Sequence, residues 1–207
     1  MLSEEDRETL EGLAKKHDFD ERMEMLEKYH AYTLEEATPE RVLLRHGRYT
    51  LCEITVKRRR IHVDIQEHGV CRFAYLGSND AIKAVLFLAE STPGYLEEKW
   101  SCGRNLVEPT EWLTSAASYD VLDLLRSEAE DVEEQEDSSL LRADWSRVVD
   151  ALDCEQFDNA AYAPFHEALS DIDWELVTCH LGYRPVDAFL HCLHAAREAK
   201  RQLAKLI

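Results

Sequence analysis

The spacing of apolar residues changes twice along this chain of 207 residues, and that change sets the fold class. Between about residues 48 and 76 apolar side chains recur at every second position, which predicts strands. On either side of this stretch they recur at helical spacing. We therefore expect an α+β protein with N-terminal helices, a small three-stranded antiparallel meander and a larger helical C-terminal part.

Three runs of alternating residues define the expected meander. The apolar residues stand at even-numbered positions before residues 57–60 and at odd-numbered positions after them. The stretch 57–60 is therefore expected to be a turn or a bulge. Residues 67–69, which end in glycine, predict the second turn. The apolar members of the runs are Ile54 and Val56, then Ile61, Val63 and Ile65, then Cys71, Phe73 and Tyr75.

The segment before the meander is expected to be helical. Ser3 followed by Asp6 is typical of a capping box at the start of a helix. A second helix is expected over residues 20–32, where apolar residues fall on one face. Pro39 then indicates a turn or a short helix leading to residues 43–44.

The pattern divides the chain into two expected parts, residues 1–94 and residues 95–207. The first part contains the meander and ends with a helix over residues 81–89, capped by the residues before it. The second part has helical spacing throughout, and Pro185 is expected to open its last helix. The residues of that helix expected to face inward are Phe189, Leu190 and Leu193.

Several protein classes are excluded by composition. No stretch approaches the roughly 18 consecutive apolar residues that a membrane span needs, so no membrane association is expected. The N-terminal residues show no basic segment followed by an apolar one, so we expect no secretory leader and a cytoplasmic location. The six cysteines form no C-x-x-C pair, and we interpret them as reduced thiols.

Negative charge is concentrated in one stretch. The chain has 42 acidic and 24 basic side chains, a net charge of -18, and residues 120–175 alone contain 18 acidic and 3 basic ones. The densest part contains Glu128, Glu130, Asp131, Glu133, Glu134, Glu136 and Asp137. Such a face attracts basic proteins, although a charged run is also typical of a solvated linker.

This charge pattern favours a cytosolic binding or regulatory protein that engages a basic protein partner. Immunity proteins, antitoxin-like proteins and phage-encoded inhibitors are examples of the expected type. A basic run of Lys57, Arg58, Arg59 and Arg60 at the expected hairpin tip gives an alternative, a nucleic-acid binder. Because the whole chain is strongly negative, nucleic acid is not the expected partner. The oppositely charged regions also allow a homodimer.

An enzyme with scattered catalytic residues is a further alternative, although no catalytic residue can be named. The sequence lacks the common phosphate-binding, dinucleotide-binding, zinc-protease and hydrolase motifs, and no cofactor is expected. The best metal candidate lies on the last helix, where Asp187, His191, His194 and Glu198 share one face. Nothing elsewhere in the sequence completes a site, so we interpret these four residues as a polar, solvated stripe.

Overall fold

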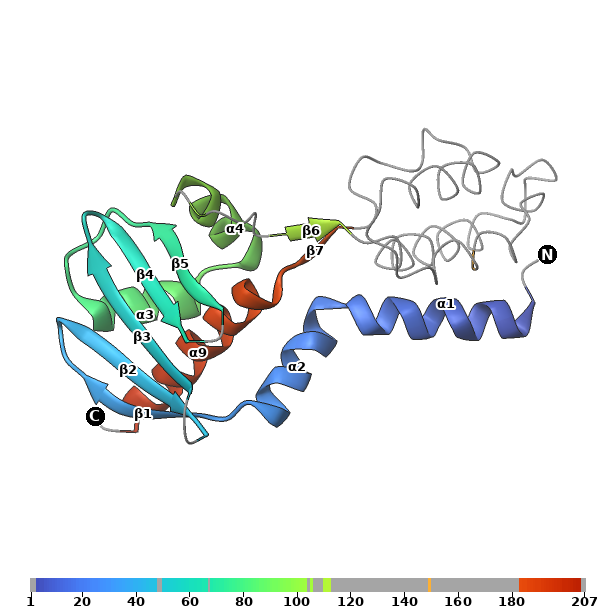
Figure 1. Cartoon of the computed structure of the whole chain (residues 1–207), viewed down its shortest axis with the longest axis horizontal. Helices are drawn as coiled ribbons and strands as arrows, with labels where there is room; N and C mark the ends of the chain where they lie inside the picture. The colour runs from blue at the N-terminus through green and yellow to red at the C-terminus, as the bar shows by residue number, and fades with distance from the viewer. Residues whose placement is uncertain are drawn as a thin grey trace. The chain divides into compact units, whose positions relative to one another are not determined.

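The computed structural model describes residues 3–47, 50–66, 68–103, 105, 110–112, 149 and 183–205 (Figure 1). The chain divides into two compact units. Unit 1 comprises Met1–Arg22 and Glu111–Arg184, and unit 2 comprises Met23–Thr110 and Pro185–Ile207. The expected boundary between residues 94 and 95 stays a prediction.

Two helices, α1 (Glu4–His17) and α2 (Phe19–Tyr29), begin the chain. The side chain of Ser3 accepts a hydrogen bond from the backbone N–H of Asp6, and the Asp6 carboxylate accepts one from the Ser3 hydroxyl. This confirms Ser3 as the predicted N-cap, but the Asp6 carboxylate bonds the Ser3 hydroxyl and not the Ser3 backbone N–H that a capping box would use. Asp18 lies between the helices, and its carboxylate accepts from the N–H of Glu21 in the first turn of α2.

Unit 2 is built on a five-stranded antiparallel sheet with the strand order β1-β2-β3-β4-β5. The strands are β1 (Tyr32–Ala37), β2 (Arg41–His46), β3 (Thr50–Lys57), β4 (Arg60–Ile65) and β5 (Gly69–Ala74). Consecutive strands are neighbours, so the sheet is a meander as predicted, and the α+β class is confirmed. The prediction of three strands was wrong, because residues 32–46 form two more.

The two strands that the sequence pattern missed have weak alternation. In β2, Val42 and Leu44 are fully buried, but Leu43 between them is also apolar and conceals the period of two. In β1, the register shifts between Leu34 and Glu36, and such a bulge interrupts the alternation of faces.

The three predicted strands correspond to β3, β4 and β5. The change from even to odd positions occurs at a two-residue turn between the paired residues Lys57 and Arg60, which confirms the predicted turn. Their inward-facing residues are buried, namely Cys52, Ile54, Ile61, Val63, Ile65, Cys71 and Phe73. The sheet therefore has a buried inner face and a more exposed outer face.

Helices α3 (Ala81–Glu90) and α9 (Asp187–Leu203) pack on each other and on the inner face (Figure 1). Asp80 caps α3 as predicted, since its carboxylate accepts from the N–H groups of Ile82 and Lys83. Small buried side chains such as Ala84 on α3 and Ala195 on α9 allow close approach of the two helices. None of the described helices is long and apolar enough to cross a membrane.

Three aromatic rings join the helices to the sheet. Helix α4 (Pro93–Cys102) contacts β5, and its Trp100 meets Phe73 of β5 edge-on at 5.4 Å between ring centroids. Phe189 of α9 lies 5.6 Å from Trp100, which confirms its predicted inward position. Each aromatic pair of this kind adds about 0.5–1.5 kcal/mol beyond the burial of its area.

A second sheet has two strands, β6 (Thr110–Trp112) and β7 (Tyr183–Pro185). Pro185 thus ends a strand, and α9 begins at Asp187 after Val186, two residues later than predicted. The sequence of unit 2 stops at Thr110 and resumes at Pro185, so α9 comes from a separate stretch of chain.

Candidate functional site

Charge is divided unequally between the two units. Unit 1 has 27 acidic and 8 basic side chains, a net charge of -19, whereas unit 2 has 15 acidic and 16 basic ones, a net charge of +1. The predicted partner-binding residues belong to unit 1 and lie outside the described residues: Glu128, Glu130, Asp131, Glu133, Glu134, Glu136 and Asp137. The excess negative charge therefore belongs to unit 1 alone.

The metal candidate lies on α9, but its histidines are not solvated as predicted. His191 and His194 are only 8% and 3% exposed, because this face of α9 packs against β1. The prediction counted histidine as a polar residue that remains in water. An imidazole buries much of its ring when its nitrogens find hydrogen-bond partners, so the solvated interpretation was wrong for these two residues.

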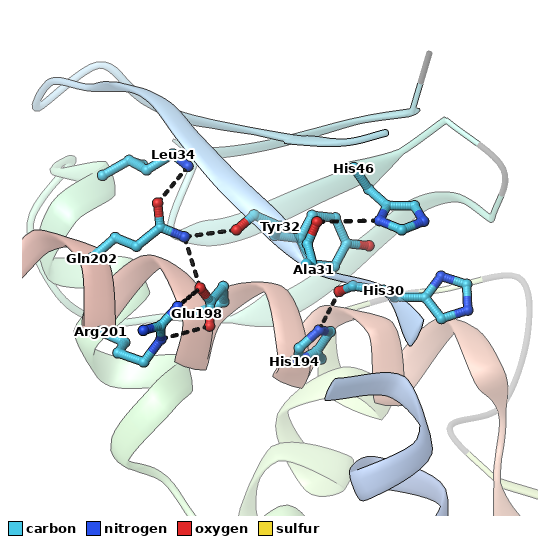
Figure 2. Close-up of polar contacts among 9 residues, drawn as sticks. All are labelled: His30, Ala31, Tyr32, Leu34, His46, His194, Glu198, Arg201 and Gln202. Carbon is cyan, nitrogen blue, oxygen red and sulfur yellow. Dashed lines mark hydrogen bonds and ion pairs between the residues drawn. The ribbon is translucent and has the colours of Figure 1, made fainter. Parts of the chain in front are cut away.

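Two polar contacts hold these histidines beside β1. The hydroxyl of Tyr32 lies 3.3 Å from Nδ1 of His191. Nε2 of His194 lies 2.6 Å from the carbonyl oxygen of His30 (Figure 2). Because a carbonyl can only accept, Nε2 of His194 is the donor in this contact, and Nδ1 is its second ring nitrogen. This buried Nδ1 atom has no hydrogen-bond partner within the part of the chain that the structure describes.

His191 is part of a histidine cluster, which we define as His30, His46, His68 and His191. The ring centroids of His68 and His30 lie 4.4 Å and 5.1 Å from that of His191, and His46 lies 4.8 Å from His30. Burial lowers the pKa of His191 to about 4, and the nearby imidazoles of His68 and His30 add to this effect. His191 is therefore neutral at pH 7.

The four residues of the metal candidate do not form a ligand set. The carboxylate of Glu198 accepts hydrogen bonds from Arg201 and Gln202 instead, and the contact with Arg201 lowers the pKa of this carboxyl (Figure 2). Among the described residues, no group of three or more His, Cys, Asp or Glu side chains is arranged to hold a metal ion. We assign no metal centre to α9.

The carboxamide of Gln202 covers the outer edge of β1. Its Oε1 atom accepts from the N–H of Leu34 at 2.8 Å, and its Nε2 atom donates to the carbonyl of Tyr32 at 2.6 Å (Figure 2). These backbone groups are the ones that a further strand would bind. A groove of about 470 Å³ opens between β1 and the end of α9, and Gln202 lines it. Gln202 thus takes the place of a sixth strand.

The other edge strand, β5, is covered in a similar way. Asn105 accepts from the N–H of Arg72 at 2.8 Å and donates to the carbonyl of Arg72 at 2.7 Å. The same amide nitrogen donates to the carbonyl of Trp100 at 2.9 Å, near the end of α4. At each edge of the sheet, a side-chain amide therefore bonds two backbone groups that another strand could bind.

The basic run forms the tip of the β3–β4 hairpin. Arg58 and Arg59 make its two-residue turn with φ angles of 52° and 61°, which are typical of a type I′ turn. Asn-Gly suits this turn best, whereas a left-handed backbone costs a residue such as arginine about 1–2 kcal/mol. The carbonyl of Arg59 accepts from the N–H of Tyr75 at 2.9 Å, which fixes the tip against the end of β5.

The hairpin tip belongs to a larger basic surface, which we call the basic face: Lys57, Arg58, Arg59, Arg60 and Arg72. The register places Lys57 opposite Arg60 on the outer face, and Arg72 opposite His62. Burial and then the nearby charges of Arg72, Lys57 and Arg60 lower the pKa of His62.

The basic face lacks carboxylates, in contrast to the rest of the outer face. None of its five cations forms an ion pair within the described residues. On the same side of the sheet, Arg41 pairs with Glu36 and Glu53, and Arg45 pairs with Glu35. Surface arginines that have no internal partner remain available to an external anion.

The cysteines of unit 2 offer no reactive thiol on the sheet. Cys52, Cys71 and Cys192 are free and buried together where α9 crosses the inner face. Burial raises the pKa of Cys52 and Cys192, which keeps both thiols protonated. The predicted burial of Cys192 is confirmed, and Cys71 points away from the cation of its neighbour Arg72.

Sequence reasoning missed most of the histidine cluster and the amide of Gln202. His30, His46 and His68 precede β1, end β2 and follow β4, so no spacing rule joins them. Only the register of a five-stranded sheet brings these three positions to one end. The sequence prediction would have grouped these three histidines only if it had recognised β1 and β2 as strands of the sheet.

Comparisons with known proteins assign no role to these residues. No protein-family model matches this chain, and no curated protein or solved structure matches it.

Proposed function

We propose that this chain is a cytoplasmic binding or regulatory protein that engages a basic protein partner through the acidic side chains of unit 1. The observation that carries the proposal is the division of charge, -19 on unit 1 against +1 on unit 2. If the acidity served only solubility, it would be spread over both units. Its confinement to one unit gives the chain a directed electric field.

Such a field acts mainly on the rate of encounter. Electrostatic steering raises association rates up to about 10⁸–10⁹ M⁻¹s⁻¹ at low salt, against about 10⁵–10⁶ M⁻¹s⁻¹ for neutral partners. Salt removes this advantage, since the screening length is about 10 Å at 0.1 M. The proposed role is that of an immunity protein, an antitoxin-like protein or a phage-encoded inhibitor, in which rapid capture of a basic target matters.

The test begins with capture of the partner from lysate of the native host by the full chain, followed by association kinetics with the purified partner. Neutralisation of five acidic residues of unit 1 should lower the association rate at least tenfold, and added salt should remove most of the difference. These residues are Glu128, Glu130, Asp131, Glu133 and Glu134, replaced by the corresponding amides.

A matched control changes the net charge by the same amount within unit 2. It neutralises the exposed residues Glu24, Glu27, Glu40, Asp64 and Glu90. Because unit 2 carries no excess charge, this variant should slow association by less than about threefold. Equal effects of the two variants would show that only total charge matters, and a partner without a basic surface would overturn the proposal.

A further inference from the structure

We propose that the basic face of unit 2 binds the phosphodiester backbone of a nucleic acid, in a manner independent of base sequence. This site lies on the described outer face of the sheet, and all its residues belong to unit 2. Three observations support it: the absence of internal carboxylate partners, the strained backbone of the turn and the arrangement of the cations on neighbouring strands.

The first observation is the contrast between paired and unpaired arginines on one side of the sheet. Arg41 and Arg45 form ion pairs with Glu36, Glu53 and Glu35. The cations of the basic face have no such partner among the described residues. A protein that needed only a soluble edge would gain from mixing both signs of charge there. The basic face instead contains cations without interspersed carboxylates, which favours binding of an external anion.

The second observation is the backbone of the tip. Arg58 and Arg59 both have positive φ angles, although a two-residue turn of this type accepts Asn-Gly with less strain. Backbone strain is concentrated at binding sites, where the side chain is needed more than local stability. The N–H of Tyr75 holds the Arg59 carbonyl, so the two guanidinium groups project from a fixed turn.

The third observation is the spacing of the cations and the character of the surface around them. Lys57, Arg60 and Arg72 lie on three adjacent strands, which together span about 10 Å at ~4.8 Å per strand. Cations spread over this width can contact successive phosphates of one nucleic-acid strand. The described outer-face positions of β2 to β5 include no Phe, Tyr or Trp to stack on bases, so contacts to phosphate dominate.

The strong negative charge of the whole chain argued against nucleic acid, but that charge belongs to unit 1. Unit 2 has a net charge of +1, and charges farther than about 8 Å from a phosphate are largely screened at physiological salt. Contacts between guanidinium groups and phosphate are short-range and bidentate, so they persist under this screening.

The test measures binding of the full chain to a fluorescein-labelled oligothymidylate of roughly 20 nucleotides by anisotropy, as a function of salt. The variant R58N/R59G places the preferred Asn-Gly pair in the turn and removes two cations. It should bind at least about tenfold more weakly, and the slope of log K against log salt should fall by about 1.4, or ~0.7 per lost contact.

Two comparisons keep the result specific. Arg72→Gln, on a different strand, should also weaken binding several-fold. Arg41→Gln removes an ion-paired cation from the same side of the sheet and should change binding less than about twofold. The R58N/R59G variant should melt no lower than the wild type, so weaker binding cannot come from unfolding. A duplex with the same number of phosphates shows whether one strand or a double helix is preferred.

The proposal is overturned if the wild-type chain does not bind the oligonucleotide at low salt. It is also overturned if R58N/R59G binds with unchanged affinity, or if Arg41→Gln weakens binding as much as Arg72→Gln. Failure here leaves the proposed capture of a basic protein intact, because that function depends on Glu128 and its neighbours in unit 1.

Discussion

The two ends of the five-stranded sheet treat basic side chains in opposite ways. At the β3–β4 end, the side chains of Arg58 and Arg59 are exposed on a strained turn. At the other end, His191 is buried among imidazoles, with its pKa lowered to about 4. The comparison shows that a group able to carry positive charge contributes to packing where it is neutral and bonded. Where it stays charged and unpaired, it is available for binding.

Acid should destabilise the fold through the buried His191 at the histidine end of the sheet, and this is the largest effect that we expect. The unfolded chain protonates a histidine near pH 6.5, whereas folded His191 resists protonation down to about pH 4. The unfolded state therefore binds more protons, and the free energy of unfolding falls as the pH falls between these values. The expected loss is about 3 kcal/mol, measured from urea unfolding at a series of pH values.

The groups that face His191 enter this prediction. The nearby imidazoles of His68, His30 and His194 lower the pKa of His191. The carboxylate of Asp187 raises it. His191→Gln keeps a hydrogen-bonding side chain beside the Tyr32 hydroxyl and should remove most of the acid sensitivity above pH 4.5. His62→Gln, opposite Arg72 and beside the basic face, should remove less, because the His62 side chain is only half-buried. Equal effects would contradict the contrast between the two ends.

Substitution at the hairpin tip should stabilise the protein, since the native sequence of the turn is not the most stable one. Replacement of Arg58-Arg59 by Asn-Gly relieves the left-handed strain and should raise the free energy of unfolding by about 1–2 kcal/mol. Thermal and urea unfolding at pH 7 measure the change. A variant less stable than the wild type would show that the arginine side chains stabilise the turn, and the strain argument would fail.

The smallest effect concerns the edge of β1, beside the histidine end. Gln202→Glu keeps an acceptor for Leu34 but loses the donor to Tyr32, and it places a carboxylate beside Glu198. We expect a loss of about 1 kcal/mol in the free energy of unfolding. Size-exclusion chromatography at high concentration should show more association, because the Tyr32 carbonyl at the edge of β1 then lacks this donor. An unchanged elution profile would indicate that the edge is protected by other means.

The sequence predicted those parts of the fold that have strong local patterns. The alternation of Ile61, Val63 and Ile65 predicted β4, and the change of parity before Ile61 predicted the tip. The residue before α3 and the inward face of α9 were also predicted from local rules. The strands β1 and β2 were missed because Leu43 and the bulge after Leu34 disturb the alternation.

The candidate site was predicted less well, because it depends on long-range register. The run from Lys57 to Arg60 is contiguous, so its charge could be read directly from the sequence. Arg72 joins it only through the pairing of β4 with β5. His191 and His194 were found by helical spacing, yet their burial depends on β1, which no local pattern predicted. The predicted binding role of the acidic residues stays a prediction.

The position of α9 in the chain has a consequence for synthesis on the ribosome. The sheet and α3 are complete at Glu90, but the helix that covers much of the inner face begins only at Asp187. At about 5–20 residues per second, α9 begins to emerge roughly 5–20 s after α3. During this interval apolar side chains such as Ile61 and Phe73 lack part of their cover, and the edge of β1 lacks Gln202. The nascent chain therefore passes through a period of exposure in which chaperones, or premature pairing of its edges, can act on it.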